Sequence, residues 1–310
     1  MSRTIYYNNS SNTPLACTRW YKYQIVAGAK VQKSRPLKAG SLFHDMAQKI
    51  TATSNIFSLT QPGPGRSELF DTVDQLTATK LAGLACDGLQ RGLINPAATR
   101  EFCFKINDTE RVAAALLANN GIELPADTTV IRIGTMDQIT YQESADFILI
   151  DDHKTTEKTI DGELLRNYDL KSQPFFYTIA RRDLALQDPE QFATMGLPAA
   201  ALQAAVNGRI KFRYHFYSFG KDEIVSTPYR LYNELELAEY ERLFFEKELL
   251  AVYLHLNPAA STKDGTLTGA CYFCPFKGIC SLHDPEAEAD RFSKWPLGFA
   301  EYNPADHAKH

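Results

Sequence analysis

The sequence predicts an α/β or α+β protein with a mixed central sheet flanked by helices. Stretches with apolar residues at helical spacing alternate along the chain with stretches typical of strands, which favours a layered fold. The chain has 310 residues, of which 44% are hydrophobic and 23% charged. This is an ordinary globular composition, and the length suffices for a sizeable core in one elaborated domain or two small ones.

Each expected element has a local signal. The stretch 38–50 carries apolar side chains at 42, 43, 46, 47 and 50, which is a helical spacing. The strand-like stretches 128–140 and 146–156 are joined by a short link, so we expect them to pair as a hairpin. The other expected helices are 69–94 (one or two helices), 111–121, 172–186 and 232–256, and the other expected strands are 101–107 and 209–219.

We expect a single domain over residues 1–310, without internal repeats. Its segments would be an N-terminal arm (1–37), a core (38–220) with a helical insertion (66–98), a C-terminal helix and cysteine segment (221–285) and a tail (286–310). No run of 18 apolar residues is present, and the N-terminal residues lack the apolar region of a secretory signal. The expected location is therefore the cytoplasm, with no membrane partner.

Charge is distributed unevenly along the chain. The first 44 residues contain seven Lys and Arg and no Asp or Glu, and since the whole chain carries −4, the other 266 residues carry −4 − 7 = −11. The pI near 6.0 argues against indiscriminate polyanion binding. A basic arm can still contact phosphates, although such charge runs are often only solvated faces. The candidate phosphate contacts are Lys30, Lys33, Arg35 and Lys38.

The two strands of the expected hairpin end in an acid–base group. Asp137 stands near the end of one strand, and Asp152 and Lys154 stand at the end of the other, two residues apart and so on one face. Two carboxylates at a sheet edge suit Mg²⁺ or Mn²⁺, and a nearby lysine can orient a water or stabilise charge on a phosphate. The alternative is a solvated strand end with a local Asp–Lys pair.

The wider pattern resembles the RecB-like branch of the PD-(D/E)xK nucleases. The stretches "GTMDQI", "ILIDDHKTT" and "QPFFY" match its G-x-x-D, D/E-x-K-T and Q-x-x-x-Y motifs, and "GSLFHDMAQKI" matches its G-x-x-x-H helix. The residues in these motif positions are His44, Asp137, Asp152, Lys154, Gln173 and Tyr177. Two details depart from a simple match: Pro174 must occupy the first turn of its helix, and a second acid, Asp151, precedes Asp152.

The resemblance implies a restriction-endonuclease-like fold and a role for each of these residues. The metal would be held by His44, Asp137, Asp152 and the main-chain carbonyl of His153. Lys154 would position or activate the attacking water. Gln173 and Tyr177 would orient Lys154 or the DNA backbone.

The cysteines suggest a second metal site. Cys271, Cys274 and Cys280 form a C-x2-C-x5-C cluster, which in a cytosolic chain favours a metal over disulfides. Zinc would use these three with His283, whereas an iron–sulfur cluster would need a fourth thiolate, for which Cys17 is the candidate. The segment "PLACTRWYKYQ" resembles the opening of the iron–sulfur subgroup of these nucleases, which includes the AddB nuclease domain and CRISPR-associated RecB-like exonucleases. That resemblance implies a 4Fe–4S cluster joining the N-terminal and C-terminal segments.

Together these features imply a Mg²⁺- or Mn²⁺-dependent deoxyribonuclease, in particular an exonuclease on single-stranded or end-containing DNA. Two other hypotheses remain at this point. One is a catalytically weak iron–sulfur DNA-binding or adaptor module of a repair, recombination or CRISPR-type complex; the other is a zinc-stabilised structural protein. No P-loop helicase motif is present, so unwinding would require a helicase or another recombination or CRISPR subunit as partner.

Overall fold

The structure is a computed structural model, and it describes residues 3–28, 34–61, 68–169, 171–261 and 274–276. The chain forms two compact units, which are described separately below. The first unit comprises 1–32, 105–134 and 238–310, and the second comprises 33–104 and 135–237. Three elements have residues in both units: β2 (Thr99–Asn107), β3 (Thr128–Gln142) and α11 (Glu234–Leu256).

The first unit is organised around the start of β3. β1 (Arg3–Tyr7) pairs with it in parallel, from Arg3 opposite Thr128 to Tyr7 opposite Arg132. A buried apolar cluster joins these strands to helices: Ile5, Val112, Leu116, Val130 and Val252. The remaining elements of this unit are η1 (Asn9–Ser11), α1 (Asn12–Leu15), α2 (Thr18–Tyr21), η2 (Lys22–Val26), α6 (Thr109–Asn120) and η5 (Pro258–Ala260).

The second unit contains a mixed sheet. The end of β3 pairs antiparallel with β4 (Phe147–Thr156), and β4 pairs in parallel with β5 (Ile210–Ser218). The strands β6 (Glu223–Ser226) and β7 (Arg230–Leu231) pair antiparallel with β5. The predicted mixed sheet flanked by helices is therefore confirmed, and the parallel β4–β5 pair is what makes the sheet mixed.

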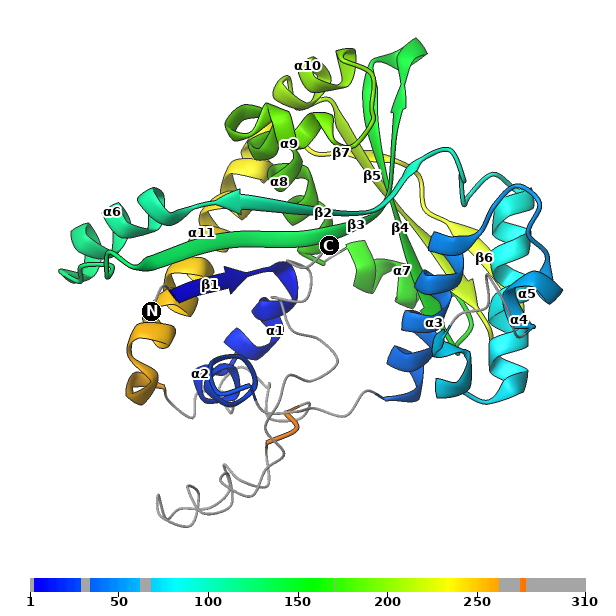
Figure 1. Cartoon of the computed structure of the whole chain (residues 1–310), viewed down its shortest axis with the longest axis horizontal. Helices are drawn as coiled ribbons and strands as arrows, with labels where there is room; N and C mark the ends of the chain where they lie inside the picture. Colours follow the sequence, from blue (N-terminus) through cyan, green and yellow to red (C-terminus); the bar gives the residue numbers. More distant parts are fainter. Residues whose placement is uncertain (1–2, 29–33, 62–67, 170, 262–273, 277–310) are drawn as a thin grey trace. The chain divides into compact units, whose positions relative to one another are not determined.

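Helices lie on both sides of β4 and β5 in this unit (Figure 1). One side carries α3 (Arg35–Lys49), α4 (Ile56–Thr60), η3 (Glu68–Thr72) and α5 (Gln75–Gln90). The other side carries α8 (Gln173–Gln187), α9 (Pro189–Ala193) and α10 (Ala200–Val206), and the unit also contains η4 (Glu143–Ala145) and α7 (Gly162–Asp169). An apolar core of this unit lies between α3 and α5 and reaches β5 at Tyr217.

Most of the expected elements are present, with boundaries set by local capping. α3 begins three residues before the expected position because Ser34 is its N-cap and Pro36 fits the first turn. The stretch 69–94 divides into η3 and α5 because Asp74 caps α5, its carboxylate accepting from the Thr77 N–H at 2.9 Å. The short elements β1, β6, β7, α7, α9 and α10 were not expected. No helix among the described residues is long and apolar enough to cross a membrane.

One glycine allows α3 to approach β4 closely. A Cβ built on Gly40 would lie only 3.3 Å from the Thr155 Oγ1, which is tighter than an ordinary contact. The missing side chain thus lets the helix pass over the end of the strand. His44 follows Gly40 by four residues, about one turn, and so lies on the same side of the helix.

Candidate metal and acid–base site

The antiparallel pair of β3 and β4 brings two acids and a lysine together in the second unit, from the interior of β3 and the second half of β4. Asp152 and Lys154 point to one face of β4, and the Lys154 Nζ lies 2.5 Å from the Asp152 Oδ2. The Asp137 Oδ2 accepts a hydrogen bond of 2.7 Å from the main-chain N–H of His153. The hairpin expected from the sequence therefore exists, but Asp137 lies in the interior of β3, which continues to Gln142, rather than near its end.

The helix α8 adds two polar groups to the same face. Gln173 is its first residue and Tyr177 lies one turn later, so both side chains share one side of the helix. The Gln173 Nε2 donates to the Asp152 Oδ1 at 2.9 Å and to the Tyr177 hydroxyl at 3.0 Å. Pro174 stands in the first turn, as expected, where its missing N–H breaks no helical hydrogen bond.

A histidine and a third acid complete the group. The His44 Nδ1 lies 3.6 Å from an Asp137 oxygen and 3.4 Å from a Glu101 oxygen. These three residues form the one group of possible metal ligands found among the described residues, with one atom of each within 4.8 Å of the others. Asp152 is not in that group because its carboxylate faces Lys154 and Gln173.

Glu101 was missed by the sequence analysis. It lies on β2, which pairs with β3 and so carries Glu101 toward the strand that bears Asp137. Its φ is +50°, a conformation that non-glycine residues rarely adopt and that is concentrated at functional sites. The sequence holds only one signal for it, an acid next to the apolar run 102–104 of an expected strand.

The site crowds negative charge among partly buried side chains, of which Asp152 is fully buried. Burial, together with the nearby Asp137 carboxylate, raises the pKa of Asp152 to about 6 in spite of Lys154. Burial and the proximity of Glu101 also raise the pKa of Asp137. Burial alone would lower the pKa of His44, but Asp137 and Glu101 raise it to about 9. For Lys154 burial is likewise outweighed by Asp152 and Asp137, so its pKa is raised.

These residues fit a hard divalent cation. Carboxylate oxygens with one imidazole are donors that suit Mg²⁺ and especially Mn²⁺. Three acids share the site with one lysine and one histidine, and burial, with a further contribution from the repulsion among the acids, raises the pKa of Asp137 and Asp152. A cation bound between the acids would relieve that repulsion.

The second acid of the motif points the other way. Asp151 belongs to the opposite face of β4, where one oxygen accepts from Arg213 Nε at 2.5 Å, from the Tyr229 hydroxyl at 2.9 Å and from His215 Nε2 at 3.2 Å. Its other oxygen accepts from Gln138 Nε2 at 3.1 Å. Burial would raise the pKa of Asp151, but His215 and Arg213 lower it to about 2. This carboxylate is thus fully engaged in the protein interior.

The His153 side chain also lies on the opposite face. Its ring stacks on His215 at 5.3 Å between centroids, its Nδ1 lies 3.1 Å from the Tyr217 hydroxyl, and burial holds its pKa well below the usual value. In an extended strand the N–H and C=O of one residue point to the same edge. Because the His153 N–H points toward Asp137, its carbonyl is directed to that edge too.

The basic arm is only partly described. Lys30 and Lys33 lie outside the described residues. Arg35 is tied to other side chains, since its guanidinium lies 3.0 Å from Asp74 and 3.7 Å from Glu157. Lys38 is half-buried on α3.

The cysteine segment is described only at Cys274, because Cys271, Cys280 and His283 lie outside the described residues. Cys17 is buried and is the N-cap of α2 in the first unit. Within that unit the Tyr23 and Phe276 rings are 5.4 Å apart, so the segments that follow Cys17 and Cys274 do meet. The described residues contain no cluster of cysteines.

A mixed sheet that carries carboxylates and a lysine on adjacent strands, next to a histidine on a helix, is an arrangement suited to metal-assisted hydrolysis. The sequence profile of the PD-(D/E)XK nuclease superfamily matches residues 10–281. The chain therefore belongs to this superfamily of nuclease hydrolases, and its sheet and flanking helices are consistent with a restriction-endonuclease-like fold. None of the curated proteins matches the chain.

Proposed function

We propose that the protein is a Mg²⁺- or Mn²⁺-dependent deoxyribonuclease of the RecB-like branch, acting as an exonuclease on single-stranded or end-containing DNA. One observation carries the proposal: the family match coincides with a partly buried site in which Asp137, Asp152, His44 and Lys154 converge. The RecB-like motifs favour DNA as the substrate. They also favour a helicase, or a recombination or CRISPR-type subunit, as a protein partner.

In this proposal the metal is held by His44, Asp137, Asp152 and the carbonyl of His153, with Glu101 as a further candidate ligand. The bound cation would stabilise the negative charge that develops on the scissile phosphate. The close grouping of His44, Glu101 and Asp137, and the raised pKa of the nearby Asp152, support this assignment.

The remaining residues would position the attacking water and the DNA strand. A water oxygen bonds to phosphorus while the bond from phosphorus to the leaving sugar oxygen breaks; the water loses a proton and the sugar oxygen gains one. The ammonium of Lys154 would hold that water or donate to the phosphate. Gln173 would keep Asp152 and Tyr177 in place, which is supported by its two hydrogen bonds. Lys30, Lys33, Arg35 and Lys38 remain candidates for phosphate contacts, and Arg35 must first leave its acidic partners.

The test compares linear and circular single-stranded DNA, linear duplex DNA and single-stranded RNA, each end-labelled or stained after gel separation. With Mg²⁺ or Mn²⁺ we expect linear single-stranded DNA to be degraded and circular single strands to persist. EDTA should abolish cleavage, and the Lys154→Met variant should not cleave DNA even with the metal present. A folded protein that cuts none of these substrates, or that cuts them equally well in EDTA, would refute the proposal.

We also propose that Cys17, Cys271, Cys274 and Cys280 hold a 4Fe–4S cluster that joins the N-terminal and C-terminal segments. The ring contact of Tyr23 with Phe276 supports the approach of these segments. Anaerobically purified protein should be brown and contain iron and acid-labile sulfide. Cys17→Ser should lose the colour, and His283→Ala should keep it. Colourless anaerobic protein with one zinc, lost in His283→Ala but kept in Cys17→Ser, would overturn the cluster.

A further inference from the structure

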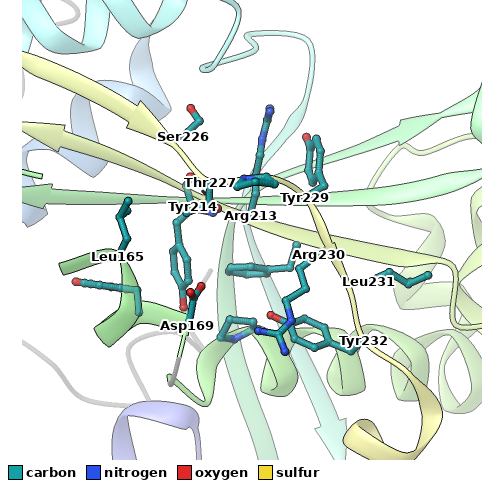
Figure 2. Close-up of a pocket in the computed structure, with 14 residues that line it drawn as sticks. Leu165, Asp169, Arg213, Tyr214, Ser226, Thr227, Tyr229, Arg230, Leu231 and Tyr232 are labelled. Carbon is teal, nitrogen blue, oxygen red and sulfur yellow. Dashed lines mark hydrogen bonds between the residues drawn. The ribbon is translucent and has the colours of Figure 1, made fainter. Parts of the chain in front are cut away.

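A pocket of about 560 Å³ lies beside the acidic site, entirely within the second unit (Figure 2). Its lining is rich in aromatic side chains, with Tyr168, Phe212, Tyr214, Tyr229 and Tyr232 among them. A volume of this size is in the range of small-molecule sites and is large enough for a nucleotide. The pocket has no part in the hydrolysis described above.

Tyr214 connects this pocket to the acidic site. It is the β5 neighbour of Asp152 in the parallel β4–β5 pair, so both side chains lie on the same face of the sheet. The Lys154 Nζ is 5.9 Å from the centre of the Tyr214 ring. A group bound against this ring would therefore lie close to Lys154.

The Tyr214 hydroxyl lacks a hydrogen-bond partner among the described residues, although its side chain is only 4% exposed. A buried hydroxyl without a partner is unfavourable, and such groups are rare in folded proteins. The ring is held by Tyr168 and Phe212, whose centroids are 5.1 and 4.9 Å away. The hydroxyl is thus kept in place in the pocket wall, where a ligand can supply the missing partner.

The polar groups of the lining suit a nucleobase better than a phosphate. Asp169 contributes a carboxylate, which would repel a phosphate but accepts a hydrogen bond from a base amino group. Arg213 is not available for a phosphate because it is held by Asp151. Arg230, 46% exposed, lies over the Tyr232 ring at 4.9 Å and provides a cationic plane on which a base can stack.

From these observations we propose that the pocket binds one unpaired nucleobase of the nucleic-acid strand whose phosphate lies at the acidic site. The proposal rests on the function proposed above, in that it takes nucleic acid as the substrate. A base within a duplex is stacked and paired and cannot enter such a pocket without leaving the helix. The pocket would therefore make the protein selective for single strands and frayed ends.

The experiment uses single-stranded deoxyoligonucleotides with 2-aminopurine at successive positions, titrated with the full-length protein in EDTA so that no cleavage occurs. Stacking in the pocket should quench the fluorescence at one position. An abasic residue at that position should weaken binding about tenfold, as expected for the loss of one base–aromatic stack.

Two variants test the pocket itself. Tyr214→Phe keeps the ring and removes only the hydroxyl, and Arg230→Gln changes an exposed side chain, so both should fold. Each should weaken binding about threefold to tenfold for the intact oligonucleotide and much less for the abasic one. Arg209→Gln is the matched control: Arg209 is 49% exposed and paired with Asp146, as Arg230 is paired with Glu236, and it should behave as wild type.

Equal binding of intact and abasic oligonucleotides, or wild-type binding by Tyr214→Phe and Arg230→Gln, would overturn the pocket assignment. Cleavage is measured separately with Mn²⁺. Protein that cuts DNA but shows no base dependence keeps its proposed function and loses the pocket. Protein that binds the base in the expected way but cuts nothing keeps the pocket and loses the proposed function.

Discussion

Two adjacent carboxylates on β4 have opposite surroundings. Asp151 is met by four hydrogen-bond donors, two of them on Arg213 and His215, and its pKa falls to about 2. Asp152 is equally buried but shares its face with other acids, and its pKa rises to about 6. Successive side chains of a strand point to opposite faces, so Asp151 is held among donors in the interior, whereas Asp152 faces Lys154 and Gln173 in the acid–base site.

The largest expected effect is on cleavage and follows from replacing Asp152. Asp152→Asn should lower cleavage by about a thousandfold or more, because a candidate metal ligand is lost. Its thermal stability should stay equal or rise, since a buried charge is removed. A variant that cuts at the wild-type rate would show that this face does not carry the chemistry.

For Asp151 we expect the reverse: a loss of stability with little change in cleavage. Asp151→Asn should lower the free energy of unfolding by about 3 kcal/mol, because Arg213 and His215 lose a buried partner. Cleavage by the folded fraction should stay within about threefold of wild type. Denaturant unfolding and activity per folded molecule measure both quantities, and unchanged stability would break the comparison.

A buried acid in the first unit tests the same electrostatic reasoning. Burial and nearby Asp108 raise the pKa of Glu248 to about 8, in spite of Arg132 and Arg111. Since this exceeds the ordinary glutamate pKa of 4.5, the stabilising contribution of Glu248 is complete below about 4.5 and is lost as the pH rises from there through about 8.

Glu248→Gln does not titrate, and it should therefore gain stability relative to wild type as the pH rises from 5 to 9. We expect a gain of about 2 kcal/mol at pH 9 and little difference at pH 5. Urea unfolding at both pH values measures this. A constant difference between the two proteins at both pH values would argue that Glu248 is ionised throughout.

The smallest effect concerns the approach of α3 to β4. Gly40→Ala should push the helix from Thr155 by a few tenths of an ångström and lower cleavage about threefold to tenfold by displacing His44. Gly83→Ala on α5 is the control, because its Cβ would make an ordinary contact of 3.8 Å with Ile56. If both variants retained full activity, the close approach would have no role in positioning.

Much of the site follows from local sequence patterns. The alternation of side chains along a strand predicts that Asp152 and Lys154 share a face, and helical spacing predicts the pairing of Gln173 with Tyr177. The structure bears out both arrangements. These relations span a few residues, so they depend on backbone geometry alone.

The parts that escaped prediction depend on contacts between distant segments. Glu101 lies near His44 and Asp137 because β2 pairs with β3. No local sequence pattern predicts that pairing. The aromatic pocket likewise combines α7 with β5 and with the segment around β7. Tyr229 directly precedes this two-residue strand and Tyr232 directly follows it. A single sequence carries little information on such pairings.

The most direct test of the account measures Mn²⁺ binding, by electron paramagnetic resonance of the free ion, for wild type, Asp151→Asn and Asp152→Asn under conditions where all three are folded. We expect one site in wild type, an unchanged affinity in Asp151→Asn, and an affinity lowered about tenfold or more in Asp152→Asn. Equal binding by both variants, or loss of binding in Asp151→Asn alone, would contradict the assignment of the metal site to the Asp152 face of β4.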